Sequence, residues 1–164
     1  MTLRIIGLNH HNASLDYREK LAFSHEEIQS CLKDLIASDE IKEAVILSTC
    51  NRTEFYLQTN EEGEEYTKTW LKKNKNINKN TEDLLFSLKG EKAIIHLSRV
   101  ACGLDSMILG EPQILGQLKN AYKSSVESGA ISKDFSKLFD HIFRLAKKNT
   151  YKYKHQQQSC FCIL

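Results

Sequence analysis

Residues 44–58 read AVILSTCNRTEFYLQ, and the fold can be worked out from this stretch. Its first four residues are apolar and include β-branched members, which is typical of a buried strand. Residues 53–58 are rich in strand-forming types, so a second strand is expected directly after the first. The polar residues between them therefore lie at a strand end. A turn that serves stability alone favours Gly, Pro or Asp, so this one is a candidate site.

Cys50 is the candidate nucleophile in this turn. The strand backbone holds its thiol in place, and Arg52 supplies positive charge two residues further on. A cation close to a thiol raises the fraction of reactive thiolate. The alternative is that Cys50 is a small apolar residue that caps the strand. The residue types alone leave both interpretations open.

Strands and helices are expected on both sides of this hairpin. The helix over 25–37 is indicated by apolar residues spaced three and four apart, and the helix over 64–73 carries Trp70 and Leu71 inward. The expected strands are 3–8, 43–49, 53–58 and 84–88, and the expected helices in this half are 16–23, 25–37 and 64–73. The order βαββαβ predicts an α+β domain with a ferredoxin-like antiparallel sheet and two covering helices.

The remaining pattern is helical from Glu91 onward. Helices are expected at 91–103, 112–128 and 133–151, with Pro112 in the first turn of the second. They predict a helical subdomain packed on the sheet, and the last helix is expected to start a long connector. The polar stretch 72–80, KKNKNINKN, predicts a solvated loop or a frayed helix end.

Composition restricts the class of protein. The chain has 164 residues, 41% of them hydrophobic and 27% charged, as expected for one soluble globular domain. A net charge of +2 gives no strong basic field for nucleic acid. No apolar stretch is long enough to span a bilayer and no signal peptide opens the chain, so a cytoplasmic protein is expected. The five cysteines predict free thiols, with no disulfide framework and no metal site.

Three blocks of sequence resemble glutamyl-tRNA reductase. They are Ser48–Glu54 (STCNRTE), Gly7–His10 (GLNH) followed by Arg18–Phe23 (REKLAF), and Gly103–Gln117 (GLDSMILGEPQILGQ). Their order also agrees with that family. The resemblance covers residues 3 to about 148, which correspond to the N-terminal catalytic domain.

The resemblance implies a reaction. In this family a cysteine, here Cys50, takes the glutamyl group from Glu-tRNA as a thioester, because even a small thiolate fraction is a strong nucleophile. Hydride from NADPH then releases glutamate-1-semialdehyde for tetrapyrrole (porphyrin) biosynthesis. The implied partners of the full-length enzyme are glutamyl-tRNA and the next enzyme of the pathway, an aminotransferase.

The resemblance also assigns residues. His96 matches a functional histidine and is expected to protonate the leaving ribose oxygen, although a lone histidine on a partly apolar helix is more often a core residue. His10 competes for this role. Arg52 is expected to grip the substrate carboxylate. The other expected substrate-binding residues are Thr49, Asn51, Ser106, Glu111, Pro112, Gln113 and Gln117. Read without the family, Asp105 or Ser106 would merely cap a helix.

The C-terminal end departs from the family pattern. The expected units are an α/β part at 1–90, a helical part at 91–148, and a non-family tail at 149–164 that is frameshifted or disordered. The chain is expected to be either a cloned domain or a frameshifted product. We favour the frameshift, because the resemblance ends inside a predicted helix. No Gly-x-Gly-x-x-Gly occurs, so the NADPH-binding domain is expected to be absent, as is the dimerisation domain. This chain alone is then expected at most to bind or hydrolyse glutamyl-tRNA.

A function of another class stays open. A ferredoxin-like sheet could equally be a non-catalytic RNA- or protein-binding module, because one fold hosts many functions. An RNA-reading sheet exposes stacking aromatic residues on its central strands. Phe55 and Tyr56 are adjacent in sequence and must face opposite sides of a strand. Each face of the sheet would therefore offer only one of these two rings for stacking on a base.

Overall fold

The computed structural model describes residues 2–106 and 112–161, with side chains for 2–106 and 113–148. In chain order the elements are β1 (Thr2–Asn9), α1 (Leu15–Leu21), α2 (His25–Ile36), β2 (Ile41–Ser48), β3 (Arg52–Thr59), α3 (Glu61–Lys75), α4 (Lys79–Glu82), β4 (Phe86–Lys89), α5 (Glu91–Ala101), α6 (Pro112–Glu127) and α7 (Lys133–Phe161).

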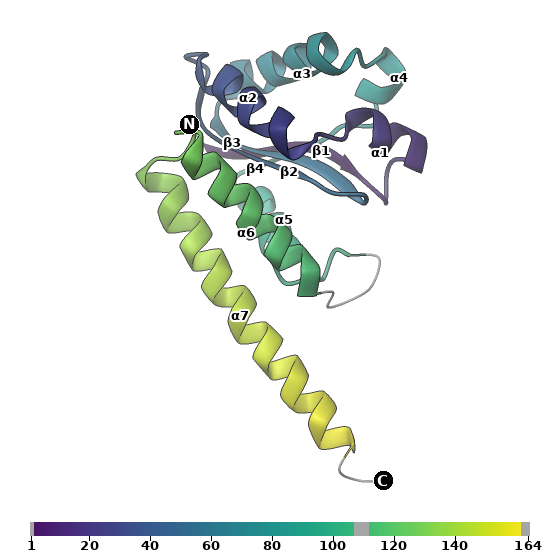
Figure 1. Cartoon of the computed structure of the whole chain (residues 1–164), viewed down its shortest axis with the longest axis vertical. Helices are drawn as coiled ribbons and strands as arrows, with labels where there is room; N and C mark the ends of the chain where they lie inside the picture. Colours follow the sequence, from purple (N-terminus) through teal and green to yellow (C-terminus); the bar gives the residue numbers. More distant parts are fainter. Residues whose placement is uncertain (1, 107–111, 162–164) are drawn as a thin grey trace.

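The four strands form one antiparallel sheet in the order β2-β3-β1-β4. This is the ferredoxin-like order, so the expected α+β fold is confirmed. Helices α1 to α4 cover one face of the sheet, and α5 to α7 lie against the other (Figure 1). The long helix α7 projects well beyond the rest of the molecule, as the connector prediction required.

Both faces of the sheet are buried, and each has its own hydrophobic core. Ile46 and Phe55 pack with α2 and α3 on one side, while Val45 and Tyr56 pack with α5 to α7 on the other. Phe55 and Tyr56 are both 0% exposed. Neither central aromatic ring can therefore stack on a nucleic-acid base, which counts against the RNA-binding alternative.

The segment 72–80 is more ordered than its composition predicts. Helix α3 continues to Lys75 and ends at Asn76, whose φ of 48° is the left-handed conformation that asparagine tolerates. Asn78 then caps α4 by accepting a hydrogen bond from the Thr81 N–H. Ile77, between the two caps, is buried in the core. Residues 72–75 are therefore a helix end, one of the two alternatives expected for this segment, and only 76–78 form a loop. Most of the segment is exposed, as expected, but Ile77 is not.

Several other boundaries differ from the expected ones. The largest differences are at α3, which begins at Glu61 instead of residue 64, and at α7, which continues to Phe161 instead of residue 151. Strand β4 begins at Phe86 instead of residue 84, and α5 ends at Ala101 instead of residue 103. Leu84 and Leu85 belong instead to the turn after α4, where their N–H groups donate to the carbonyls of Thr81 and Glu82. The α5 end is a turn in which the Gly103 N–H donates to the Val100 carbonyl.

Glu43 on β2 fixes the start of α7. Its carboxylate is fully buried and accepts hydrogen bonds from the N–H groups of Ser132, at 2.6 Å, and Phe135, at 3.2 Å. A negative charge at a helix N-terminus is favourable because the first N–H groups have no partner within the helix. This contact attaches the helical layer to the strand that leads to Cys50.

Gly7 allows β1 to approach β3 closely. It pairs with Glu54 in the sheet register, and a Cβ built at position 7 would lie 2.9 Å from the Glu54 Cα and even closer to the Thr53 carbonyl oxygen. Any side chain here would push β3 away. The absence of a side chain at position 7 therefore helps to place Glu54.

Candidate active site

The turn between β2 and β3 is organised by Thr49. Its hydroxyl oxygen accepts hydrogen bonds from the N–H groups of Asn51 and Arg52, both at 3.2 Å. Its own N–H donates to the Arg52 carbonyl at 2.8 Å. The loop after β1 reinforces the turn, because the His10 N–H donates to the Asn51 carbonyl at 3.0 Å. Cys50 lies at the tip of this turn, and it is exposed.

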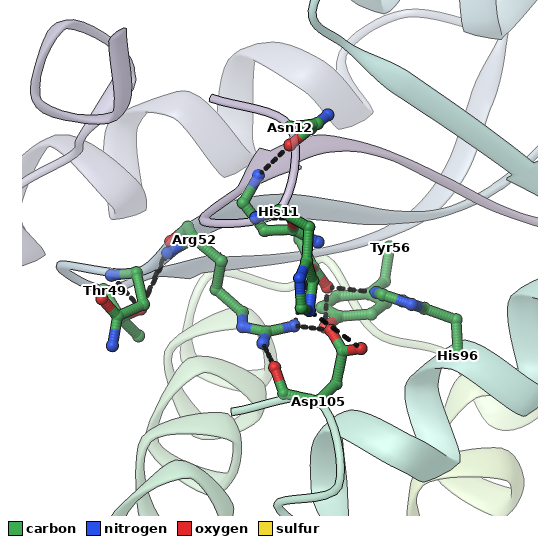
Figure 2. Close-up of polar contacts among 10 residues, drawn as sticks. His11, Asn12, Thr49, Arg52, Tyr56, His96 and Asp105 are labelled. Carbon is green, nitrogen blue, oxygen red and sulfur yellow. Dashed lines mark hydrogen bonds and ion pairs between the residues drawn. The ribbon is translucent and has the colours of Figure 1, made fainter. Parts of the chain in front are cut away.

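Arg18 on α1 is the cation that contacts the Cys50 backbone. Its Nε donates to the Cys50 carbonyl at 3.1 Å, and its Nη1 donates to the Ala13 carbonyl at 2.8 Å. Arg52 was expected to supply positive charge to the Cys50 thiol, but its side chain donates its hydrogen bonds to Glu54 and Asp105. Its guanidinium points away from Thr49 and toward Asp105 (Figure 2). Sequence reasoning assigned no role to Arg18, although its block was part of the resemblance.

Arg52 is the buried cation of the site, with a side chain only 1% exposed. Its Nη1 donates to Glu54 Oε1 at 2.9 Å and to Asp105 Oδ2 at 3.0 Å, and its Nη2 donates to the Asp105 carbonyl. Burial by itself lowers the pKa of Arg52, but Glu54, Tyr56 and Asp105 outweigh it and raise that pKa. The guanidinium is therefore charged and held in one orientation. Asp105 pairs with Arg52 instead of merely capping a helix.

Glu54 links Arg52 to His96. Its Oε2 accepts a hydrogen bond from the Tyr56 hydroxyl at 2.7 Å and lies 3.1 Å from His96 Nε2. Burial raises the pKa of Glu54, but His96, Arg52 and Tyr56 together hold it below its ordinary value. Figure 2 shows His96 reaching from its helix, α5, toward Tyr56. Sequence reasoning quoted Glu54 within a motif but gave it no function.

His11 lies near Asp105, the partner of Arg52, and His10 packs against His11. Their rings are 3.9 Å apart, and His11 Nε2 lies 3.7 Å from Asp105 Oδ1. Burial, and then the charges of His11 and Arg52, lower the pKa of His10. His10 is therefore neutral at neutral pH. It contacts the Cys50 turn through its backbone, whereas His96 contacts Glu54 through its ring.

The other expected substrate-binding residues lie around the start of α6. Ser106 follows Asp105 and is half-buried, while Gln113 and Gln117 are exposed. Glu111 lies outside the described residues, and for Pro112 only the backbone, at the first position of α6, is described. Within residues 2–106 and 113–148, hydrogen bonds join Thr49, Arg52 and His96 into one network. They do not extend to Gln113 or Gln117.

A surface hollow of about 830 Å³ lies elsewhere, at the free edge of β4. Its lining includes Arg4, Glu61 and Glu64 but none of the expected site residues. Arg4 already forms ion pairs with both glutamates, Glu64 at 2.5 Å and Glu61 at 3.3 Å. Lys68 and Lys89 also pair with these glutamates, at 3.1 Å and 3.6 Å. Because these charged groups are already paired with one another, the hollow is a weaker candidate site than the Cys50 turn.

We expect Cys50 to react first with a thiol reagent such as iodoacetamide. Burial raises the pKa of the Cys31 thiol to about 11, so Cys31 is almost entirely protonated and slow at pH 8. The measurement is peptide mass spectrometry over time, in a variant with Cys160→Ser and Cys162→Ser. Equal rates at Cys31 and Cys50 would contradict the interpretation of Cys50 as the accessible nucleophile.

Comparison with known proteins identifies the family. Residues 6–152 match the model of the glutamyl-tRNAGlu reductase N-terminal domain. The chain belongs to this family. It is 43% identical to the glutamyl-tRNA reductase of Shewanella pealeana and 44% identical to that of Methylococcus capsulatus, over 149 residues in each case. Those alignments cover 90% of this chain, but only 35% and 36% of the two relatives.

A solved structure shares the fold of this reductase domain. Glutamyl-tRNA reductase from Methanopyrus kandleri superposes with a TM-score of 0.75 and 27% identity, over 92% of this chain and 34% of that one. The chain thus spans about a third of the length of its full-size relatives. The matched residues extend slightly past residue 148, near which the resemblance was expected to end.

Metal-binding and membrane-spanning features are both absent from the described part of the chain. There, no group of three or more His, Cys, Asp or Glu side chains is arranged to hold a metal ion. Within the same ranges, no helix combines the length and apolar character needed to cross a membrane.

Proposed function

We propose that this chain forms the thioester in a glutamyl-tRNA reductase, with Cys50 as the nucleophile. The observation that carries the proposal is the exposed thiol on a hydrogen-bonded turn, directly joined to the buried Arg52–Glu54–His96 network. A rigid turn presents the sulfur without burying it. The network supplies a fixed cation from the start of β3 and an imidazole from α5, and a nucleophile beside such groups is the usual composition of an acyl-transfer site.

The proposed reaction proceeds by acyl exchange. The Cys50 thiolate attacks the ester carbonyl carbon that joins glutamate to the ribose of the tRNA. A carbon–sulfur bond forms, and the carbon–oxygen bond to the ribose breaks. His96, in its protonated form, donates a proton to the departing ribose oxygen, since general acids of this kind lower the barrier for a poor leaving group.

Recognition of the glutamyl group is proposed for the residues around this turn. Arg52 carries a positive charge that suits the substrate's side-chain carboxylate. Asp105 now occupies part of its guanidinium, so the substrate has to share or exchange that contact. The remaining proposed substrate-binding residues are Thr49, Asn51, Ser106, Glu111, Pro112, Gln113 and Gln117.

Reduction of the thioester is proposed for the full enzyme, with NADPH as hydride donor and the semialdehyde as product. The residues present do not fit NADPH, because the sheet is antiparallel and no glycine-rich turn joins a strand to a helix. No step proposed here uses that cofactor. We also propose that the protein is cytoplasmic and that the product of the full enzyme passes to an aminotransferase. Within this chain we propose an α/β part at 1–90, a helical part at 91–148 and a tail at 149–164.

The test is mass spectrometry of the purified chain after mixing with charged tRNA. With glutamyl-tRNA we expect one added glutamyl group, on the peptide that contains Cys50, followed by slow release as free glutamate. Glutaminyl-tRNA is the matched control, because its aminoacyl group lacks the side-chain charge that Arg52 is proposed to bind. Absence of any adduct with glutamyl-tRNA, even after rapid acid quenching, would reject the proposal.

A further inference from the structure

Glu54 makes more contacts than the charge balance of Arg52 requires. It is 0% exposed, and both of its carboxylate oxygens are used. Oε1 accepts from Arg52 Nη1 at 2.9 Å, and Oε2 lies 2.7 Å from the Tyr56 hydroxyl and 3.1 Å from His96 Nε2. A buried carboxylate that only neutralised Arg52 would not need an imidazole at the far oxygen.

The protonation states of this cluster follow from its chemistry. The lowered pKa of Glu54 leaves the carboxylate ionised, so both oxygens can only accept hydrogen bonds. Burial, and then Glu54, raise the pKa of Tyr56 well above its usual value, so its hydroxyl keeps its proton and donates it to Oε2. His96 Nε2 faces the same oxygen and must therefore carry a hydrogen.

This constraint determines which ring nitrogen of His96 is free. A neutral imidazole has one N–H and one lone pair, so a hydrogen on Nε2 leaves the lone pair on Nδ1. Among the described residues no other hydrogen bond reaches the His96 ring, which is 13% exposed and packs edge-on against Phe86 at 5.4 Å. Nδ1 is thus the nitrogen that the described part of the fold leaves unused.

We propose that Glu54 is a positioning residue that holds His96 in the Nε2–H form and makes Nδ1 the nitrogen that exchanges protons with the substrate. The role of Nδ1 rests on the function proposed above. In the acyl exchange, the Nδ1–H of the imidazolium passes to the ribose oxygen as the carbon–oxygen bond breaks. The ring becomes neutral and keeps its Nε2–H on Glu54. It then regains a proton from water, into which the thiol proton was released.

Glu54→Gln is expected to change the tautomer of His96, so that the hydrogen of the neutral ring moves from Nε2 to Nδ1. Arg52 can only donate, so it will select the amide oxygen of the substituted side chain and hold it at the former Oε1 position. The amide NH₂ group then faces His96 Nε2 and donates to it, which moves the ring hydrogen to Nδ1. With Nε2 accepting from the amide, the ring is held neutral. Its Nδ1–H could then leave only by forming an imidazolate, so it is a far weaker acid than the imidazolium of the wild type. Loss of a correctly placed acid or tautomer lowers rates by about 10²- to 10⁴-fold.

The tautomer is measured by long-range ¹H–¹⁵N NMR of histidine-labelled protein, at a pH where titration of the same signals shows the ring neutral. A His96→Gln variant assigns the His96 signals. We expect Nε2–H in the wild type and Nδ1–H in Glu54→Gln. Tyr56→Phe is the matched control. It removes the other hydrogen bond to Oε2 and should retain Nε2–H, so loosening of the cluster alone would not mimic the reversal.

Two results overturn the proposal. One is a neutral His96 ring in the wild type that carries its hydrogen on Nδ1. This result does not depend on whether any variant folds. The other is an unchanged tautomer in a folded Glu54→Gln protein. The reversal together with a fall in thioester formation supports the proposal, provided that iodoacetamide still labels Cys50 at the wild-type rate. The expected tautomers without any thioester in the wild type would support the role of Glu54 in holding His96 and reject the proposed function instead.

Discussion

Cys50→Ser is expected to abolish the glutamyl adduct with glutamyl-tRNA. A serine hydroxyl at the same exposed turn has nearly the same shape, but at neutral pH it is hardly ionised and is a far weaker nucleophile than a thiol. The rate of adduct formation should fall on the order of 10³-fold or more. The measurement is rapid-quench mass spectrometry at equal protein concentration.

Cys102→Ser is the matched control for this variant. Cys102 is half-buried at the end of α5 and packs against the second core, away from the Cys50 turn. Its replacement should leave the adduct rate within a few-fold of the wild type. An adduct that persists in Cys50→Ser, or one that disappears in Cys102→Ser, would place the nucleophile elsewhere.

Arg52→Met should cost about 3–5 kcal/mol of the free energy of unfolding, because it leaves the Glu54 carboxylate buried without its cation. Methionine preserves much of the side-chain volume, so the loss is mainly electrostatic. The measurement is urea denaturation followed by fluorescence of Trp70, the single tryptophan, which lies in the core on the opposite face of the sheet.

The double variant Arg52→Met with Glu54→Gln separates charge from packing. Removing the unpaired charge should recover a substantial part of the stability lost in Arg52→Met, since a neutral buried pair avoids most of the desolvation cost. If the double variant is as unstable as the sum of the two single variants, the ion pair is not the reason for the loss.

The same pair predicts how stability depends on pH. The pKa of Glu54 in the folded protein is below its ordinary value of 4.5. The ionised carboxylate therefore contributes stability above about pH 4.5, and this contribution is lost as the pH falls through the lower folded-state pKa. The wild type should lose stability in that range more steeply than Glu54→Gln does.

Much of the fold can be read from local pattern. The apolar run at 44–47 and the strand-forming residues at 53–58 indicate the central hairpin, and the helical spacing of apolar residues over 25–37 indicates α2. These elements are readable because local patterns show which side chains must be buried. The segment 72–80 is the exception. Its lysines and asparagines suggest a solvated loop or a frayed helix end, but two asparagines cap helices and Ile77 is buried in the core.

In the candidate site, too, some residues can be recognised from the sequence and others cannot. Cys50 and Arg52 stand out because polar groups follow a buried strand. Asp105 could not be paired with Arg52 from the sequence, since 53 residues separate them and no local rule links a loop to a distant strand. Glu54 was within reach of sequence reasoning. Arg52, Glu54 and Tyr56 are spaced by two, so on a strand they share one face.

That spacing also limits how the hairpin can change in length. Arg52 and Glu54 project toward the layer of α5 to α7, while Phe55 projects toward Trp70 on the opposite side. One residue inserted between Glu54 and Phe55 would reverse the upstream side chains and drive two charges into an aromatic layer without partners. Two inserted residues would leave each of these side chains on its original face of the sheet. An odd change in the length of β3 is therefore tolerable only where a β-bulge absorbs the extra residue, as one does for the register shift between Ile41 and Glu43.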